Sequence, residues 1–352
     1  MRQVLFRIPW DGIPIGDYWL PIFGWGLLLL VWLGFCAWTL YDIRRQTGRW
    51  QLPDALSTAF WIALAVAIIQ APVFGPRMAP QGAPLYGYGA MLVVGFAAAM
   101  WLANHRARRE GFPPETIGDL AIWLFLAGIG GARTFYLVQY HEIAFAGVQT
   151  LPQFLFAVVN LSSGGIVLYG SLIGGALAYF AFCHLRKLPP LTLADVITPS
   201  IFVGIGFGRI GCLLNGCCFG DRCDLPWCVQ FPAESVPWLA LVQRGFLAPD
   251  APHTPPLHPT QIYSAIDGFL IAGLTLWYHR HRRRSGDVLA LGLLLSSATR
   301  FLIEFVRGDE YGQWGTSLTI SQWISLVLFA VGMGLLAYLS RTNRKAAPAQ
   351  PA

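Results

Sequence analysis

The chain has 352 residues, of which 55% are hydrophobic and only 12% are charged. This small number of charged residues cannot cover the surface of a water-soluble protein. A lipid bilayer must therefore surround much of the chain. The net charge of +6 is spread in short clusters between apolar runs, which argues against a nucleic-acid partner. We therefore expect an integral membrane protein.

Nine apolar runs are long enough to cross a bilayer as helices, which takes about 20 residues each. The first run, residues 19–41, is too long for a signal-peptide core and lacks a basic leader, so we interpret it as a retained span. The predicted fold is an all-α integral membrane protein with about nine transmembrane helices. The other eight predicted spans are 56–75, 86–103, 117–137, 166–184, 193–211, 261–278, 287–305 and 318–340.

The basic residues predict the orientation of the chain. They are concentrated in alternate connections between the predicted spans, and cytoplasmic loops of membrane proteins carry such an excess of Lys and Arg. This pattern predicts an N-terminus outside and a C-terminus in the cytoplasm. The connections concerned carry Arg44, Arg45 and Arg49; Arg106, Arg108 and Arg109; Arg186 and Lys187; Arg280, Arg282, Arg283 and Arg284; and Arg341, Arg344 and Lys345.

Three segments outside the spans differ in character. Residues 143–160 are moderately apolar but interrupted by Pro152 and Asn160, so we expect them to lie along the outer interface or to re-enter the membrane. Residues 212–260 form the longest outer connection and are predicted to make a small head or lid. The Ala- and Pro-rich tail, 346–352, is predicted to be disordered.

Arg133, Arg209 and Arg300 fall inside predicted spans. An arginine at the bilayer centre costs about 2.5–3.5 kcal/mol on insertion scales, so a compensating partner is expected. Glu304 follows Arg300 by one helical turn and Arg307 follows it by two, which places the three on one helix face. Glu304 alone cannot neutralise these three arginines and Arg307, so the cluster favours binding of an external anion such as the phosphate of a lipid headgroup. The alternative is snorkelling of each arginine to the interface.

Several motifs, in order, resemble those of the bacterial prolipoprotein diacylglyceryl transferases. Residues 208–220 read G-R-I-G-C-L-L-N-G-C-C-F-G and resemble the family signature G-R-x-G-N-F-x-N-x-E-x-x-G. Residues 258–263 are similar to its H-P-[ST]-Q-L-Y element, and residues 300–307 to its R-x-x-x-E-F-x-R element. The resemblance extends over the last seven predicted spans, from about Tyr86 to Leu339.

The resemblance implies transfer of a diacylglyceryl group from phosphatidylglycerol to the lipobox cysteine of a prolipoprotein signal peptide, with glycerol phosphate as leaving group. This is the first step of lipoprotein maturation, and it implies a site on the periplasmic side of a bacterial inner membrane, among membrane lipids. No cofactor is implied. Residues 81–345 would form the seven-helix transferase core, and residues 1–80 an N-terminal extension with two spans.

The resemblance also implies roles for the residues that match the motifs. Arg209 and Arg300 would handle the phosphate during catalysis, and Glu304 would orient Arg300. For His258 we leave open whether it caps the following helix or contacts the substrate. The predicted substrate-binding residues are Tyr88, Arg133, Asn215, Gly220, His258, Glu304 and Arg307.

Tyr169 departs from the family pattern, because the family's M-[ST]-[FW]-H-G motif reads I-V-L-Y-G at residues 166–170. A tyrosine stands where the family has the histidine proposed as general base. Its ordinary pKa near 10 makes it a poorer base at neutral pH unless nearby cations lower that value. We predict a catalytic part for Tyr169 and keep packing or headgroup hydrogen bonding as alternatives.

The cysteines are a second departure, because Cys212 and Cys217 replace the signature's Asn and Glu. Disulfides that pin the outer loop are the simplest interpretation for an oxidising compartment. A zinc site and a reactive thiol that carries the diacylglyceryl group are the alternatives. Five of the seven cysteines cluster here: Cys212, Cys217, Cys218, Cys223 and Cys228, the last four being the possible zinc set.

Other functions remain open on the same scaffold. The chain could be a non-catalytic or thiol-redox membrane protein, or a paralogue that uses a different thiol acceptor. A transporter or channel is disfavoured, because the three intramembrane arginines all lie in the outer half of their spans rather than along a path across the membrane.

Overall fold

A computed structural model describes residues 3–8, 13–15, 18–20, 30–34, 36–37, 40–41, 44, 61–66, 68, 77, 79–160, 165, 167–307 and 315–345. The predicted disordered tail and most of the first two predicted spans lie outside the described residues. The chain divides into two compact units, Met1–Ala90 and Met91–Ala352, and each is described by itself.

The first unit contains short strands that the sequence did not predict. Strand β1 (Val4–Ile8) pairs antiparallel with β4 (Ala83–Tyr86), and β2 (Ile13–Ile15) pairs antiparallel with β3 (Tyr18–Leu20). Runs this short carry too little alternation to be recognised by periodicity. The first predicted span therefore begins too early, because residues 19 and 20 belong to β3. Residues 30–34 and 61–66, within the first two predicted spans, are helical.

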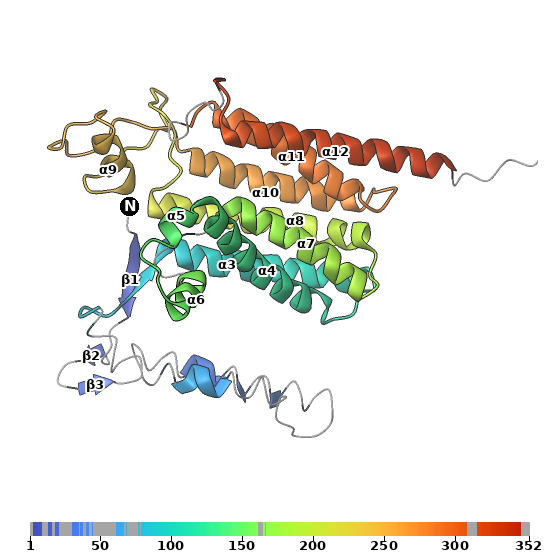
Figure 1. Ribbon diagram of the computed structural model, residues 1–352, viewed down its shortest axis with the longest axis horizontal. Coiled ribbons are helices and arrows are strands. Elements are labelled where there is room, and N and C mark those ends of the chain that lie inside the picture. Colours follow the sequence, from blue (N-terminus) through green and yellow to red (C-terminus); the bar gives the residue numbers. More distant parts are fainter. Residues whose placement is uncertain are drawn as a thin grey trace, which may run out of the picture. The chain divides into compact units, whose positions relative to one another are not determined.

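The rest of the chain is mainly long helices that run alongside one another (Figure 1). Seven of them coincide with the last seven predicted spans. Four, α3, α4, α8 and α12 as far as Arg341, are long and apolar enough to cross a membrane, which agrees with a multi-pass membrane protein. The seven are α3 (Gly87–Arg109), α4 (Thr116–Gln139), α7 (Leu168–Leu185), α8 (Pro190–Asn215), α10 (Thr260–His279), α11 (Asp287–Glu304) and α12 (Ile320–Lys345).

Glycines allow α4 and α7 to touch backbone to backbone. A Cβ built on Gly131 would lie 2.3 Å from the carbonyl oxygen of Gly170, and one on Gly170 would lie 2.2 Å from that of Gly131. Neither approach leaves room for a side chain. Small residues at such contacts are usual where helices pack closely in lipid. Lipid tails are as apolar as the side chains, so the hydrophobic effect does not drive the helices together and close van der Waals contact does.

The basic connections of the second unit meet at one end of the helices. Arg186, after α7, lies 2.6 Å from Asp119 near the start of α4. Arg282, after α10, lies 2.6 Å from Glu110 just beyond α3. Asp195 of α8 accepts hydrogen bonds from the backbone N–H groups of residues 286 and 289. These contacts join three connections that are far apart in the sequence.

The opposite end carries the irregular structure, with α5 (His141–Ala144), α6 (Leu151–Val159) and α9 (Val236–Gln243) (Figure 1). Helix α6 exposes apolar side chains, which suits a segment lying at a membrane interface. Residues 216–259 fold into a head with a small core of its own. That core consists of Phe219, Phe231 and Leu257.

Candidate functional site

Arg209 and Arg300 line one cavity of about 290 Å³, although they lie on different helices, α8 and α11. Tyr169, in the first turn of α7, lines the same cavity. Hydroxyl groups complete the polar part of its wall, including those of Ser264 on α10 and Ser321 on α12. Five helices thus bring two guanidinium groups and several hydrogen-bonding groups around a space large enough for a small anionic group.

A buried carboxylate holds Arg300 in place. Oε2 of Glu304 lies 2.8 Å from Nη2 of Arg300 and 3.4 Å from Nη1 of Arg307. The same Nη2 donates to Oγ of Ser321 at 3.0 Å. Thr319 Oγ1 donates to the other carboxylate oxygen at 3.1 Å. Glu304 thus contacts both Arg300 and Arg307. The predicted helix face is correct for Arg300 and Glu304 only, because α11 ends at Glu304 and Arg307 lies beyond it. One carboxylate shared by two guanidinium groups leaves a net positive charge.

Arg133 is not brought to this cavity. Its guanidinium donates to the carbonyl oxygens of Val158 at 3.0 Å and Gly165 at 2.9 Å, and also to that of Ala157. The first and last of these carbonyls belong to the C-terminal turn of α6, where a cation also meets the negative end of the helix dipole. The side chain lines a separate cavity with Tyr136. The structure therefore separates Arg133 from the other two intramembrane arginines.

Gly220 and His258 join the signature to the H-P-T-Q-I-Y element. The backbone N–H of Gly220 donates to the carbonyl oxygen of His258 at 2.9 Å. A Cβ on Gly220 would lie 2.5 Å from that of His258 and 2.7 Å from the carbonyl oxygen of Val306, so only glycine fits. The His258 ring lies 3.3 Å from the hydroxyl of Tyr263. Gly220 thus shapes the loop beside the site, and its predicted contact with the substrate stays a prediction.

The remaining predicted residues lie at helix ends. Asn215 is the last residue of α8, one turn and a half beyond Arg209. Tyr88 lies in the first turn of α3, within the first unit, and its part in the site stays a prediction.

The five clustered cysteines fall into two groups. Cys223 and Cys228 form a disulfide in the head, with a ring nitrogen of His258 close to both sulfurs. Cys212, Cys217 and Cys218 are free, and their sulfurs all lie within 4.8 Å of one another. The predicted zinc set of Cys217, Cys218, Cys223 and Cys228 is therefore not assembled. Hydrogen bonds from the Cys212 and Cys218 thiols, and one from the Asn215 side chain, lower the pKa of the Cys217 thiol.

Asp267 of α10 lines the same cavity as the two arginines and was missed in the sequence. Its Oδ2 accepts a hydrogen bond from Oγ1 of Thr299 at 2.9 Å. A carboxyl group inside an apolar span is itself a signal of a functional site, as an arginine is. The position of Asp267 within the predicted span 261–278 is therefore a signal that could have identified it.

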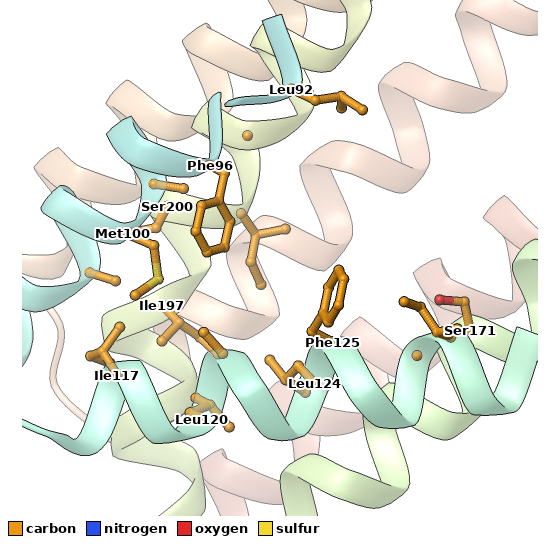
Figure 2. Close-up of a pocket in the computed structure, with 17 residues that line it drawn as sticks. Leu92, Phe96, Met100, Ile117, Leu120, Leu124, Phe125, Ser171, Ile197 and Ser200 are labelled. Atoms are coloured by element: carbon orange, nitrogen blue, oxygen red, sulfur yellow. The ribbon is translucent and has the colours of Figure 1, made fainter. Parts of the chain in front are cut away.

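An apolar groove of about 530 Å³ lies between α3, α4 and α8. Figure 2 shows the rings of Phe96 and Phe125 directed into it from facing helices, and Met100, Leu124 and Ile197 also line it. Helix α8 lines both this groove and the arginine cavity. The fold and the site together define a multi-pass membrane protein that can hold an amphiphile, with cations for its anionic head and an apolar surface for its chain.

Comparison with known proteins identifies the family. The family model described as prolipoprotein diacylglyceryl transferase matches residues 78–338. A phosphatidylglycerol–prolipoprotein diacylglyceryl transferase of Clostridium tetani is 35% identical over 72% of this chain and 92% of its own. The second such transferase of Clostridium perfringens is 33% identical over 75% of this chain and 94% of its own. The chain belongs to the prolipoprotein diacylglyceryl transferase family.

A third relative bears on the residues before the matched region. The transferase of Rhodopirellula baltica is 29% identical in an alignment that covers 95% of this chain and 88% of its own. This alignment extends well beyond the region that the family model matches, so much of the N-terminal segment also has a counterpart in that relative.

Proposed function

We propose that the protein transfers a diacylglyceryl group from phosphatidylglycerol to the lipobox cysteine thiol of prolipoprotein signal peptides. The observation that carries the proposal is that Arg209 and Arg300 line one cavity in a chain that belongs to this family. The reaction replaces a carbon–oxygen bond at the glyceryl carbon with a carbon–sulfur bond. It releases glycerol phosphate as a dianion, so charge increases on the leaving phosphate.

Arg209 and Arg300 hold the phosphodiester and stabilise the charge that develops on it. Two guanidinium groups can each donate two parallel hydrogen bonds to phosphate oxygens, which a lysine cannot do. Glu304 and Ser321 fix the direction of the Arg300 fork before the lipid arrives. Groups that are already aligned with the developing charge lower the barrier without reorganising during the reaction.

The other residues of the site bind the substrate around this pair. Arg307 shares Glu304 with Arg300 and adds to the positive charge. Asn215 and Tyr88 contribute to the headgroup site, and Tyr169 contacts the headgroup from α7. The apolar groove between α3, α4 and α8 takes an acyl chain, because its wall is almost entirely hydrocarbon.

The proposed topology has nine spans, with the N-terminus outside and the C-terminus in the cytoplasm of a bacterial inner membrane. The meeting of the basic connections at one end of the second unit supports it, since such residues mark the cytoplasmic side. The arginine cavity and the head then face the periplasm, where an exported signal peptide arrives. Residues 1–80 are an N-terminal extension, 81–345 the transferase core and 346–352 a disordered tail.

The test is transfer in reconstituted vesicles. Intact protein is supplied with phosphatidylglycerol labelled in its acyl chains and with a lipobox peptide, and labelled peptide is counted. We expect thioether-linked label on the cysteine peptide and none on the matched serine peptide. Arg209→Ala should lower the rate by about 10²-fold or more, and Arg209→Lys should not restore it. Arg244→Ala, at an exposed position in the head, is the control. Absence of transfer by the intact protein would contradict the proposal.

A further inference from the structure

Three free thiols lie together where α8 meets the head. The sulfurs of Cys212, Cys217 and Cys218 are within 4.8 Å of one another, and all three side chains are partly accessible. The neighbouring pair, Cys223 and Cys228, is joined as a disulfide and is therefore not part of this group.

The way α8 ends explains why two of these thiols meet. Gly216 adopts the left-handed conformation, with φ of 83°, and ends the helix. The N–H of Cys217 donates to the carbonyl oxygen of Cys212 at 3.1 Å, and that of Gly216 donates to Leu213 at 3.2 Å. These two bonds are those of a Schellman motif, which brings the side chains of its first and last residues into contact. Here those residues are Cys212 and Cys217.

The third thiol depends on an unfavourable backbone conformation. Cys218 has a φ of 59°, in the left-handed region that residues other than glycine rarely adopt. Helix α10 holds this turn from the other side. Thr260 Oγ1 donates to the carbonyl oxygen of Cys218 at 2.7 Å, and Gln261 Nε2 donates to that of Cys217 at 2.8 Å. Both side chains are buried. Strain maintained by surrounding contacts is typical of functional positions.

We propose that Cys212, Cys217 and Cys218 bind one Zn²⁺ ion through three thiolates and leave its fourth position for the acceptor thiol. Zinc–sulfur bonds of about 2.3 Å place the sulfurs of a tetrahedral site about 3.8 Å apart, which is within the spacing that the structure has. Thiolates select zinc over harder ions. Three protein ligands with an open position are typical of zinc sites that act on a substrate rather than stabilise a fold.

The role at the fourth position rests on the proposed transferase function. Cys212 follows Arg209 by three residues, so both lie on one face of α8. An acceptor thiol that binds zinc loses its proton to water and becomes a thiolate. Its lone pair forms the bond to the glyceryl carbon, and the electrons of the broken carbon–oxygen bond leave on glycerol phosphate. The thioether product carries no charge and is released from the ion. Zinc would thus supply the ionisation for which Tyr169 is a poor base.

The metal site is tested without reference to activity. Intact protein purified in detergent is equilibrated with Zn²⁺, freed of unbound metal, alkylated and digested with trypsin. Trypsin cuts after Arg209 and after Arg222, so the peptide 210–222 contains the three thiols and the next peptide begins with Cys223. We expect one zinc per chain and protection of this peptide from alkylation, lost on chelation. Cys183, buried elsewhere, should be unaffected by the metal. A disulfide within this peptide and no bound zinc would overturn the proposal.

The acceptor position is tested by cobalt substitution. Co²⁺ in the site should give sulfur-to-cobalt absorption that increases when a lipobox peptide is added, and the serine peptide should not have this effect. Cys217→Ala should abolish the absorption, while Cys183→Ala should preserve it. If Cys217→Ala does not fold, the peptide-dependent increase in the absorption of the intact protein still shows whether the acceptor thiol binds the metal. Transfer by the metal-free protein would refute the role of zinc at the acceptor thiol and leave the transferase proposal intact, and zinc binding without transfer would refute the transferase proposal alone. An unchanged cobalt spectrum on adding peptide would refute the acceptor role.

Discussion

Glu304 and Arg300 form an ion pair of 2.8 Å across one turn of α11, with the carboxylate fully buried and the guanidinium partly open to the cavity. The acid therefore directs the arginine toward the substrate and is itself kept out of contact with solvent. This arrangement explains how a chain can keep a carboxylate beside a phosphate-binding arginine without losing the positive charge of the site.

We predict that Glu304→Gln lowers diacylglyceryl transfer by tenfold or more, because the Arg300 fork loses its partner. Loss of one member of a buried pair also costs about 3–5 kcal/mol of stability, so the thermal midpoint in detergent should fall. Rates are to be compared at a temperature where both proteins are folded. Glu115→Gln, at an exposed position before α4, is the matched control. Normal transfer by Glu304→Gln would show that Arg300 needs no positioning.

We predict that Gly170→Ala destabilises the contact between α4 and α7. The added Cβ would lie 2.2 Å from the carbonyl oxygen of Gly131, so the two backbones must separate. Overpacking of this kind costs about 1–3 kcal/mol, measurable as a lower thermal midpoint. Gly130→Ala is the control, since a Cβ there meets nothing within 4 Å. Equal stability of the two variants would contradict the close approach.

We predict that Arg133→Met lowers stability and leaves the KM for phosphatidylglycerol unchanged. Its guanidinium satisfies carbonyl oxygens of α6 and Gly165 rather than a ligand. Each hydrogen bond to a charged group contributes about 1.5–3 kcal/mol, so the thermal midpoint should fall. Arg209→Met should show the opposite pattern, with lost transfer and nearly normal stability. A raised KM in folded Arg133→Met would place this residue at the lipid after all.

We predict that Tyr169→Phe raises the KM for phosphatidylglycerol more than it lowers kcat. Losing one hydrogen bond to a charged phosphate costs about 1.5–3 kcal/mol, or roughly a tenfold to hundredfold loss in kcat/KM. Removal of a general base would instead lower kcat by about 10²–10⁴-fold and alter its pH profile. The kinetic constants measured across pH therefore distinguish the two roles. A loss confined to kcat would make Tyr169 the base.

Contacts within one helix could be predicted from the sequence, and contacts between segments could not. The spacing of Arg300 and Glu304 by one helical turn already implies a shared face of α11, and their ion pair follows. Arg133 and Arg209 carry the same charge and both fall in predicted spans, yet they line separate cavities. Arg133 is separated from Arg209 because α6 and the residues after it fold back onto α4 and contact Arg133. Local spacing in the sequence does not encode this contact.

The cysteines also show what the sequence can and cannot predict. Their number and their replacement of the signature's Asn and Glu are visible in the chain. Their division into a disulfide and a group of three depends on the left-handed turn at Gly216 and on Thr260 and Gln261 from α10. The predicted disulfide forms between Cys223 and Cys228, and the alternative four-cysteine zinc set does not, because spacing alone cannot tell which thiols face each other.

The sequence by itself determined that this protein lies in a membrane, which segments form its seven core helices, and which family it resembles. It could do so because the bilayer imposes a length and an apolar composition on each span, and both are local properties. Only the tertiary structure decided that Arg209 and Arg300 share a cavity with Asp267 and that Arg133 does not. Which side chains meet depends on how the helices pack, and glycine contacts such as that between Gly131 and Gly170 determine this packing in three dimensions.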